Sequence, residues 1–518
     1  MERNEIRYPV GMQVFEQIIE GGYQYVDKTG LVYEMTHRYN YVFLSRPRRF
    51  GKSLLVSTLK TYFEGKRDFF KGLAMERLET EWKQYPVIHI SLASVKEKKL
   101  ELIDKQISNV LTRIEEDHGL ESKSDNPSGD RLMDIIRGCY RKYGQQVVVL
   151  IDEYDAPLLN HISDDDLDNI RYMLRALYAP LKDCLEYLRF IFITGITKFS
   201  QLSIFSELNN LENISMNPQF AALCGITQHE LETQFSIGID LLAQSQNMTR
   251  EATIDKLKNY YNGYHFAKAG DAVYNPFSLI RALNNCDFDY YWFGSGTPSY
   301  LLAVLRKYNT RINEIQFEDV GADDFDVPTE DMHSATPLLY QSGYLTITGY
   351  DSFSETYNLN YPNKEVRIGF IKSLYPKYVV GNTSSKGNTW KIVKPLLAGD
   401  LDGALSFLQR FLKSIPYQEG TRHNEGHYTA MLYVIFALTG DYVQSQVRTS
   451  DGRVDILLTT PERNYLMELK INSTAQEALD QIDSKNYTMA VTNDLPTTKV
   501  GINFSMETAT ITDWVTDN

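Results

Sequence analysis

The sequence predicts an α/β fold, with a parallel sheet in the first 200 residues and a smaller unit of strands and helices near the C-terminus. Two observations support the parallel sheet. Short apolar runs recur along this part of the chain, and segments of helical length separate them, which is typical of parallel strands covered by helices on both faces. Four runs have the length and composition of buried strands: Tyr41–Leu44, Val87–Leu92, Val147–Ile151 and Arg189–Thr194.

Residues 1–227 are the predicted parallel-sheet domain, and three further segments follow. Residues 228–370 are mainly helical, and Leu338–Arg367 within them fits two strands around a polar turn, as in a winged-helix fold. Residues 371–423 have the periodicity of connecting helices. Residues 424–518 contain a helix, a hairpin around Ser450-Asp451-Gly452, the strand NYLMELKI and the helix AQEALDQIDSKNY. We therefore expect a second α/β domain at the C-terminus.

The composition predicts a folded protein of several domains that is not attached to a membrane. The chain has 518 residues, 43% of them hydrophobic and 23% charged, and a formal net charge of −14. This charge disfavours nucleic acid as a partner unless basic residues gather locally. The four cysteines form no CxxC pair, and the sequence offers neither a signal peptide nor a membrane-spanning run. We expect a cytoplasmic protein with reduced thiols.

A phosphate-binding sequence follows the first predicted strand. Residues 46–53 read RPRRFGKS and lead into the helix LLVSTLKTYF, which matches GxxxxGK[ST] except that Arg46 replaces the first glycine. In this motif backbone amides and the lysine bind phosphates, and the hydroxyl binds Mg²⁺. The sequence predicts an ATP and Mg²⁺ site that includes Arg48, Arg49, Phe50, Gly51, Lys52, Ser53 and Leu54. Arg48 and Arg49 fit two interpretations, offsetting of phosphate charge or solvated loop arginines.

An acidic pair ends the third predicted strand. Asp152 and Glu153 follow a wholly apolar run, at the carboxyl end of a strand, where open α/β sheets bind their ligands. Asp152 is therefore a candidate ligand of Mg²⁺, and Glu153 a candidate catalytic residue that orients or deprotonates water. Thr194 or Thr197, after the fourth strand, is a candidate for contacting the γ-phosphate or this water, and an ordinary turn role fits both equally well.

A second set of charged residues lies in the C-terminal segment. Asp455 belongs to the second strand of the predicted hairpin, and Glu468 and Lys470 are separated by one residue on the next strand, so both project from one face. Two carboxylates that hold Mg²⁺ and a nearby lysine are the groups that phosphodiester hydrolysis requires. By spacing alone, the D…ExK pattern also fits a solvated strand face or a salt bridge.

Long blocks of the sequence carry a family resemblance. YVDKTGLVYEM, FLSRPRRFGKSLLVSTLKTYF, VVLIDEYDAPL and FITGITKFSQLSIFSELNNL resemble the signature blocks of the bacterial AAA-ATPase-like family, whose members typically carry a C-terminal PD-(D/E)XK nuclease-like domain. The resemblance implies a P-loop NTPase sheet followed by a restriction-endonuclease-like α/β domain, with RPRRFGKS as the usual form of the loop. It also implies Glu425 as a further acidic metal ligand and Gln481 and Tyr487 as auxiliary polar residues.

These patterns together favour an ATP-binding and ATP-hydrolysing protein coupled to a Mg²⁺-dependent nuclease-like domain that acts on DNA or RNA, with defence against foreign genetic elements as a role that the domain combination implies. From Glu425 onward the chain has six Lys and Arg against thirteen Asp and Glu, which disfavours DNA. A nucleotide-dependent switch or scaffold, or an ATPase with an inert last domain, therefore stays an alternative. P-loop proteins often borrow an arginine from a neighbouring copy, so a homo-oligomer is also expected.

Overall fold

The computed structural model describes residues 6–517, with gaps at 98, 160, 162–165, 199–209, 296–303, 306, 309–316, 329–330, 379–384, 416–424, 442–443, 451–452 and 486. The side chains of some further residues, Glu425 and Asp455 among them, also lie outside this description. The described residues form two compact units, the first up to residue 365 and the second from residue 366 onward. The helical middle region thus belongs to the same unit as the first sheet, and the connecting helices belong with the C-terminal sheet.

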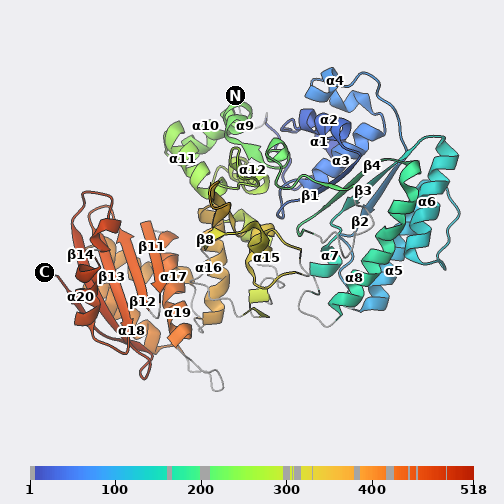
Figure 1. Cartoon of the computed structure of the whole chain (residues 1–518). Coiled ribbons are helices and arrows are strands. Elements are labelled where there is room, and N and C mark those ends of the chain that lie inside the picture. Colours follow the sequence, from blue (N-terminus) through green and yellow to red (C-terminus); the bar gives the residue numbers. More distant parts are fainter. Residues whose placement is uncertain are drawn as a thin grey trace. The chain divides into compact units, whose positions relative to one another are not determined.

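The sheet of the first unit has five parallel strands in the order β2-β3-β4-β1-β5 (Figure 1). The four strands predicted from the sequence are confirmed, with ends that differ by one residue or none. The strands are β1 (Tyr41–Ser45), β2 (Val87–Ser91), β3 (Val147–Asp152), β4 (Leu188–Gly195) and the short β5 (Glu212–Asn213). Because β4 lies between β1 and β3, the carboxyl ends of these three strands meet at one edge of the sheet.

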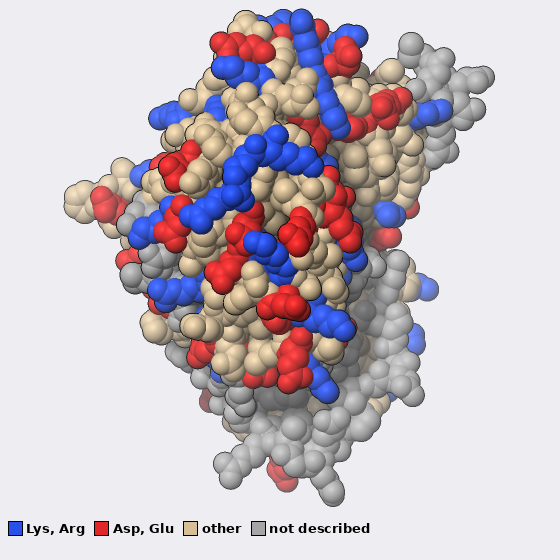
Figure 2. Space-filling view, turned by 90° about the vertical axis from the view of Figure 1, so that its right-hand side faces the viewer, with Lys and Arg blue, Asp and Glu red and all other residues tan. Residues whose placement is uncertain are grey.

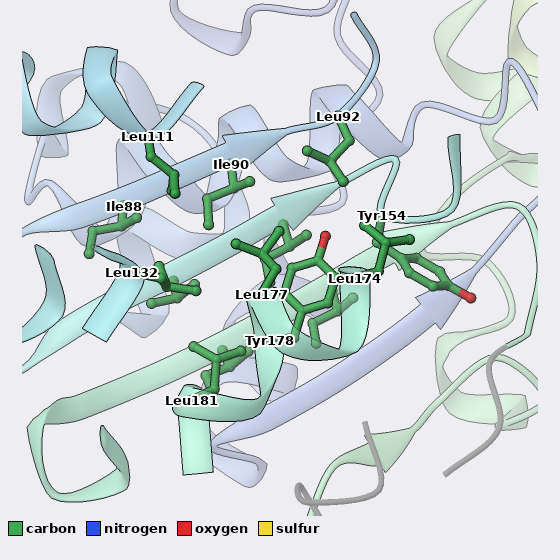
Figure 3. Close-up of a cluster of buried hydrophobic side chains, with 14 of the residues drawn as sticks. Ile88, Ile90, Leu92, Leu111, Leu132, Tyr154, Leu174, Leu177, Tyr178 and Leu181 are labelled. Atoms are coloured by element: carbon green, nitrogen blue, oxygen red, sulfur yellow. The ribbon is translucent and has the colours of Figure 1, made fainter. Parts of the chain in front are cut away.

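Helices cover both faces of this sheet (Figure 1). Alternate residues of β3 explain why two layers are needed: Val147, Val149 and Ile151 join one hydrophobic cluster, while Val148 and Leu150 are buried on the opposite face. In that cluster Ile88 and Ile90 of β2 pack against leucines of the surrounding helices (Figure 3). The helices are α1 (Phe15–Glu20), α2 (Thr29–Arg38), α3 (Lys52–Phe63), α4 (Ala74–Leu78), α5 (Leu100–Asp117), α6 (Ser128–Tyr143), α7 (Ala156–Leu159) and α8 (Leu167–Tyr178).

The middle region is mainly helical, as predicted. A capping box between Thr227 and Glu230 starts its first helix, because each residue binds the other's backbone amide. The helices are α9 (Gln228–Gln234), α10 (Ser236–Ser245), α11 (Arg250–Tyr261), α12 (Pro276–Asn285), α14 (Ala322–Phe325) and α15 (Thr336–Gln341). The two predicted strands form the hairpin of β9 (Thr346–Asp351) and β10 (Thr356–Asn360), and β8 (Phe317–Val320) adds a third strand. The short strands β6 (Ile226–Thr227) and β7 (Val273–Tyr274) pair with each other. The winged-helix character of this region stays a prediction.

The second unit contains a five-stranded mixed sheet in the order β11-β12-β13-β14-β15, in which only β13 and β14 run parallel. Its helices are α17 (Ser385–Leu397), α18 (Leu401–Lys413), α19 (Glu425–Ala437) and α20 (Ala475–Ser484), and α16 (Lys364–Tyr378) leads into it from the first unit. The strands are β11 (Gln444–Ser450), β12 (Arg453–Thr459), β13 (Asn464–Ile471), β14 (Thr497–Ser505) and β15 (Thr510–Thr516). The predicted order of helix, hairpin, strand and helix is therefore present, and β14 and β15 are additional strands.

Within the described residues, every helix is too short or too polar to cross a membrane. The four cysteines are all buried and carry free thiols.

Candidate functional site

The phosphate loop joins the end of β1 to the start of α3. Gly51 precedes α3 with a backbone φ of 82°, a left-handed conformation that glycine adopts most readily. A Cβ at this position would have no contact within 4 Å, so the space beside the helix start is open for a phosphate group. Lys52 is 7% exposed and its ammonium group donates to the carbonyls of Arg46 at 2.9 Å and Pro47 at 3.0 Å. Ser53 is partly exposed.

Arg46, which stands at the position of the first glycine of the motif, is a structural residue. Its guanidinium group donates to the carbonyls of Ser45 at 2.9 Å, Ser215 at 2.8 Å and Phe220 at 3.2 Å, and it lies 4.2 Å above the ring of Phe266. Burial lowers the pKa of Arg46 to about 10, so the group is charged at neutral pH. Arg46 thus ties the phosphate loop to the chain that follows β5.

The middle region supports the next residues of the same loop. Pro47 packs against Gly343 so closely that a Cβ on the glycine would lie 2.6 Å from the proline. The indole of Trp292 donates to the carbonyl of Arg48 at 3.3 Å. The guanidinium group of Arg49 lies 3.8 Å above the ring of Phe277 in α12. These contacts fix the backbone of the loop from the side that faces the middle region.

Phe50 completes this support. Its ring is 1% exposed and makes edge-to-face contacts with Tyr264 and Phe266, at 4.7 Å and 5.2 Å between ring centroids. The side chain of this predicted site residue is therefore packed in an aromatic cluster, and any contact of Phe50 with a nucleotide involves its backbone. Arg49 has a positive φ of 67°, which is strained for a residue with a side chain and is held by these neighbours.

The acidic pair lies at the carboxyl end of β3, as predicted. Asp152 is 4% exposed and its Oδ1 has no hydrogen-bond partner, which is costly for a buried oxygen unless a ligand binds it. Glu153 has a positive φ of 51°, and burial together with the charge of Asp152 raises its pKa. Burial lowers the pKa of Lys52, whereas the charges of Asp152, Asp155 and Glu153 raise it. The ammonium and the acids therefore interact at the same edge of the sheet.

Asp155 is the third acid of the Asp-Glu-Tyr-Asp run, and its position beside the candidate site was not predicted from the sequence. One oxygen of this buried carboxylate accepts from the amides of Ile196 at 2.9 Å and Thr197 at 2.6 Å, and from the Thr197 hydroxyl at 2.7 Å. Asp155 thereby joins the turn after β3 to the turn after β4. The other threonine candidate, Thr194, is fully buried, and its hydroxyl donates to the Leu44 carbonyl at 2.7 Å. Its side chain serves the contact between β1 and β4.

A pocket of about 90 Å³ opens beside the phosphate loop. Its walls are mostly apolar and come from the segment before α2, the start of α3, the residues around the start of β6, and α12. Residues from each part are Tyr25, Val26, Gly51, Leu54, Ile226 and Ile280. The predicted site residues Gly51 and Leu54 therefore line the same pocket.

The Asp27-Lys28 dipeptide connects this pocket to its surroundings. Asp27 accepts from the amide and hydroxyl of Thr29 and from the amide of Ala74, and so fixes the starts of α2 and α4. Lys28 lines the pocket and forms an ion pair with Glu230 of α9 at 2.6 Å. The block before the phosphate loop thus links the N-terminal segment to the middle region.

The C-terminal site residues lie on neighbouring strands. Glu468 of β13 is fully buried, and the strand register places it opposite Asp455 of β12 and beside Gly501 of β14. Lys470 lies two residues further along β13, on the same face as Glu468, and is partly exposed. The side chains of Asp455 and Glu425 lie outside the described residues, so only their positions on β12 and at the start of α19 are reported.

The auxiliary polar residues are brought together. Gln481 of α20 donates to the hydroxyl of Tyr487 at 3.2 Å. Gly501 makes this packing possible, because a Cβ there would lie 2.1 Å from the carbonyl of Ala475 at the start of α20. Among the described residues, there is no group of three or more His, Cys, Asp or Glu side chains arranged to hold a metal ion. Asp455 and Glu425 are outside that comparison.

Two family models match the chain. One, described as a predicted AAA-ATPase, matches residues 9–205, and one of the PD-(D/E)XK nuclease superfamily matches residues 423–514. A protein from Azotobacter chroococcum mcd 1, described as an uncharacterized protein in the vnfD 5′ region, is 32% identical over 527 residues, which cover 99% of this chain and 99% of the relative. The chain belongs to the AAA-ATPase-like family. It combines the ATPase-like domain of this family with a C-terminal PD-(D/E)XK nuclease superfamily domain.

The residues of this AAA-ATPase-like protein fit ATP and Mg²⁺. Gly51 leaves space at the start of α3, Lys52 supplies an ammonium group, and Ser53 supplies a partly exposed hydroxyl. Asp152 supplies a buried carboxylate oxygen that has no other partner, and this is the type of hard oxygen ligand that Mg²⁺ prefers. The loop, Lys52 and the acids lie at the sheet edge where nucleotides bind in open α/β folds.

Proposed function

We propose that this protein binds and hydrolyses ATP and couples this activity to a Mg²⁺-dependent nuclease-like domain that acts on DNA or RNA. One observation carries the ATP part. Lys52 begins α3 after β1 and Asp152 ends β3, both at the carboxyl edge of the sheet, and the buried Oδ1 of Asp152 has no hydrogen-bond partner. A bound Mg²⁺ would satisfy that oxygen.

Each residue of the site would have a distinct role. Lys52 and the loop amides would bind the phosphates, and Ser53 and Asp152 would hold Mg²⁺. Glu153 would orient or deprotonate the attacking water, and burial, which raises its pKa, makes it a stronger proton acceptor than an exposed glutamate. ATP and Mg²⁺ supply the phosphoryl group and the positive charge that offsets its negative charge. Arg48 and Arg49 would add positive charge at the loop.

The apolar pocket beside Leu54 is a candidate binding site for the adenine base. Gly51 of the phosphate loop lines this pocket, so a ligand bound at the loop could also reach the pocket. Its walls include aromatic and aliphatic side chains, among them Tyr25 and Ile280, and such an apolar lining suits a nucleotide base.

In the second unit, Glu468 and Lys470 support phosphodiester chemistry. Glu468 is fully buried on β13, opposite Asp455 in the strand register, and these two acids together with Glu425 would hold Mg²⁺. Lys470 would position water or stabilise the charge that develops on the phosphate.

The test is a pair of assays, for ATP hydrolysis and for nucleic-acid cleavage, on the same preparations. Lys52→Ala should weaken ATP binding by about tenfold or more, because a charge-assisted hydrogen bond contributes about 1.5–3 kcal/mol. Lys470→Ala should abolish cleavage and leave ATP binding unchanged. The matched controls are Lys60→Ala, a lysine of α3 whose side chain is 45% exposed, and Lys485→Ala, an exposed lysine after α20. Wild-type protein that neither binds ATP nor cuts DNA or RNA with Mg²⁺ would refute the proposal.

Charge favours one second candidate, a nucleotide-dependent switch or scaffold. The chain from Glu425 onward carries thirteen acidic against six basic residues. On the first unit, the face drawn in Figure 2 shows Lys and Arg interspersed with Asp and Glu. In this case ATP would change oligomer size or partner binding, and Asp455→Ala would leave that change intact. Light scattering with and without ATP measures it, and also tests whether copies assemble to share an arginine.

A role in defence against foreign genetic elements is the broadest part of the proposal. It predicts that cells expressing the wild-type chain resist phage or plasmid challenge and that cells expressing Lys470→Ala do not. Equal survival of the two strains would remove this role and leave the biochemical proposal standing.

A further inference from the structure

Glu365 is a fully buried carboxyl group outside the residues discussed so far. It is the second residue of α16 and the last residue of the first unit, so the chain enters the second unit directly after it. Its Oε1 accepts from the hydroxyl of Ser278 at 3.1 Å and from the amide of Trp292 at 2.7 Å. Its Oε2 has no hydrogen-bond partner. This asymmetry suits a carboxyl group whose proton, when present, is on Oε2.

Trp292 connects this carboxyl group to the phosphate loop. Its amide donates to Glu365, and its indole donates to the carbonyl of Arg48. The indole is 7% exposed and packs edge-to-face on Tyr344 at 4.9 Å, which leaves the ring little freedom. Two hydrogen bonds through one residue therefore join Glu365 to the loop backbone.

Several charged and titratable groups surround the carboxyl group. They are Arg49 of the phosphate loop, Tyr261 at the end of α11, Tyr264 after that helix, and Asp289. Burial raises the pKa of Glu365 to about 8, with Asp289 acting in the same direction and the bonds from Trp292 and Ser278 opposing it. The carboxyl group therefore changes charge in a mildly alkaline range.

We propose that Glu365 is a positioning residue for nucleotide binding, which shapes the phosphate loop through Trp292 and binds nucleotide better when its carboxyl group is neutral. The proposal rests on ATP binding at this loop, as proposed above. A triphosphate brings negative charge to the loop, and this charge disfavours an ionised carboxylate that also interacts with Arg49. The pKa of Glu365 should rise on binding, so binding takes up protons and affinity falls as the pH rises through 8.

The first experiment uses wild-type protein and a non-hydrolysable ATP analogue with Mg²⁺. Calorimetry at pH 8 in buffers with different ionisation enthalpies should show net proton uptake. Between pH 7.5 and 9 the affinity should fall by about threefold to tenfold, because one unit of pKa coupling corresponds to a factor of ten. Binding without proton uptake would overturn the proposal and leave ATP binding itself intact. Absence of binding at pH 7.5 would refute the proposed function and this inference together.

Variants separate positioning from charge. Glu365→Gln keeps an acceptor for Trp292 and should bind the analogue with an affinity that no longer depends on pH. Trp292→Phe keeps the ring and the backbone bond but loses the bond to the loop, and should bind more weakly at every pH. The matched controls are Glu251→Gln, an exposed residue of α11, and Trp390→Phe, an exposed tryptophan of α17. Glu365→Gln with the pH dependence of wild type, or Trp292→Phe with wild-type affinity, would overturn the proposal.

Discussion

Replacing Arg46 by glycine would restore the usual first glycine of the phosphate-binding motif, and the structure predicts that this harms the protein. The substitution removes three hydrogen bonds from a charged group and a contact with the ring of Phe266. Each hydrogen bond to a charged group contributes about 1.5–3 kcal/mol, and the carbonyls left in the interior lose their partner. Relief of the cost of burying the guanidinium group offsets part of this loss.

We therefore expect a net loss of about 3–6 kcal/mol in the free energy of unfolding of the first unit. This unit has roughly 360 residues and thus an unfolding entropy of about 0.75 kcal/mol/K, so its Tm should fall by about 4–8 °C. Differential scanning calorimetry of the full chain measures this change. Arg48→Gly is the matched control, because the described contact of Arg48 involves its backbone carbonyl and not its guanidinium group.

The control should change the Tm by less than about 2 °C, since it removes no buried hydrogen bond. Calorimetric titration with ATP then tests the motif itself. If the first glycine were needed to wrap the phosphates, Arg46→Gly would bind ATP more tightly than wild type. A variant with wild-type Tm and tighter ATP binding would refute the structural role assigned to Arg46.

Three further predictions concern Glu153, Gly343 and Gly501. Glu153→Gln should lower kcat for ATP hydrolysis by a factor of about 10²–10⁴ with ATP affinity retained. In the wild type, kcat should fall when the pH falls low enough to protonate Glu153. Because burial raises the pKa of Glu153, this fall should occur above the ordinary glutamate range. Gly343→Ala should weaken ATP binding because its Cβ would press on the phosphate loop, whereas Gly270→Ala, which also has a positive φ but no close neighbour, should not. Gly501→Ala should lower the Tm of the second unit by forcing α20 off the sheet, whereas Gly387→Ala in α17 has free space and should be neutral or stabilising.

Each of these predictions has a clear contrary result. For Glu153, it is a Gln variant that hydrolyses ATP as fast as wild type. For Gly343, it is equal loss of ATP affinity in the two alanine variants, which would assign the effect to backbone strain alone. For Gly501, it is an unchanged melting transition of the second unit in calorimetry.

The four strands of the first sheet were predictable because each is a short apolar run, and burial on both faces requires such a run. The motif residues Gly51, Lys52 and Ser53 were predictable for a similar reason, since phosphate binding demands these residue types at this spacing. The strands β14 and β15 were not predicted. Their residues alternate between buried and exposed only in part, and Gly501 interrupts the apolar pattern of β14.

The role of Arg46 could not be read from the motif. Its partners Ser215 and Phe220 are more than 160 residues away in the sequence, and they accept through backbone carbonyls that any residue type supplies. The same holds for the support of the loop by Trp292 and Gly343. Asp155 is an intermediate case, because its acidic character is visible in the sequence while its three donors are set by the turn after β4.

The sequence by itself determined the parallel α/β sheet and the residue types of the nucleotide site, because local periodicity and motif chemistry act over short stretches of chain. The type of the C-terminal domain followed from the resemblance of long sequence blocks to a known family. Only the tertiary structure decided that β4 separates β1 from β3, that the middle region holds the phosphate loop, and that Glu365 reaches this loop through Trp292. These features depend on which distant backbone and side-chain groups meet in the folded chain. Packing and strand pairing determine these long-range contacts, and such contacts produce no short-range pattern in the sequence.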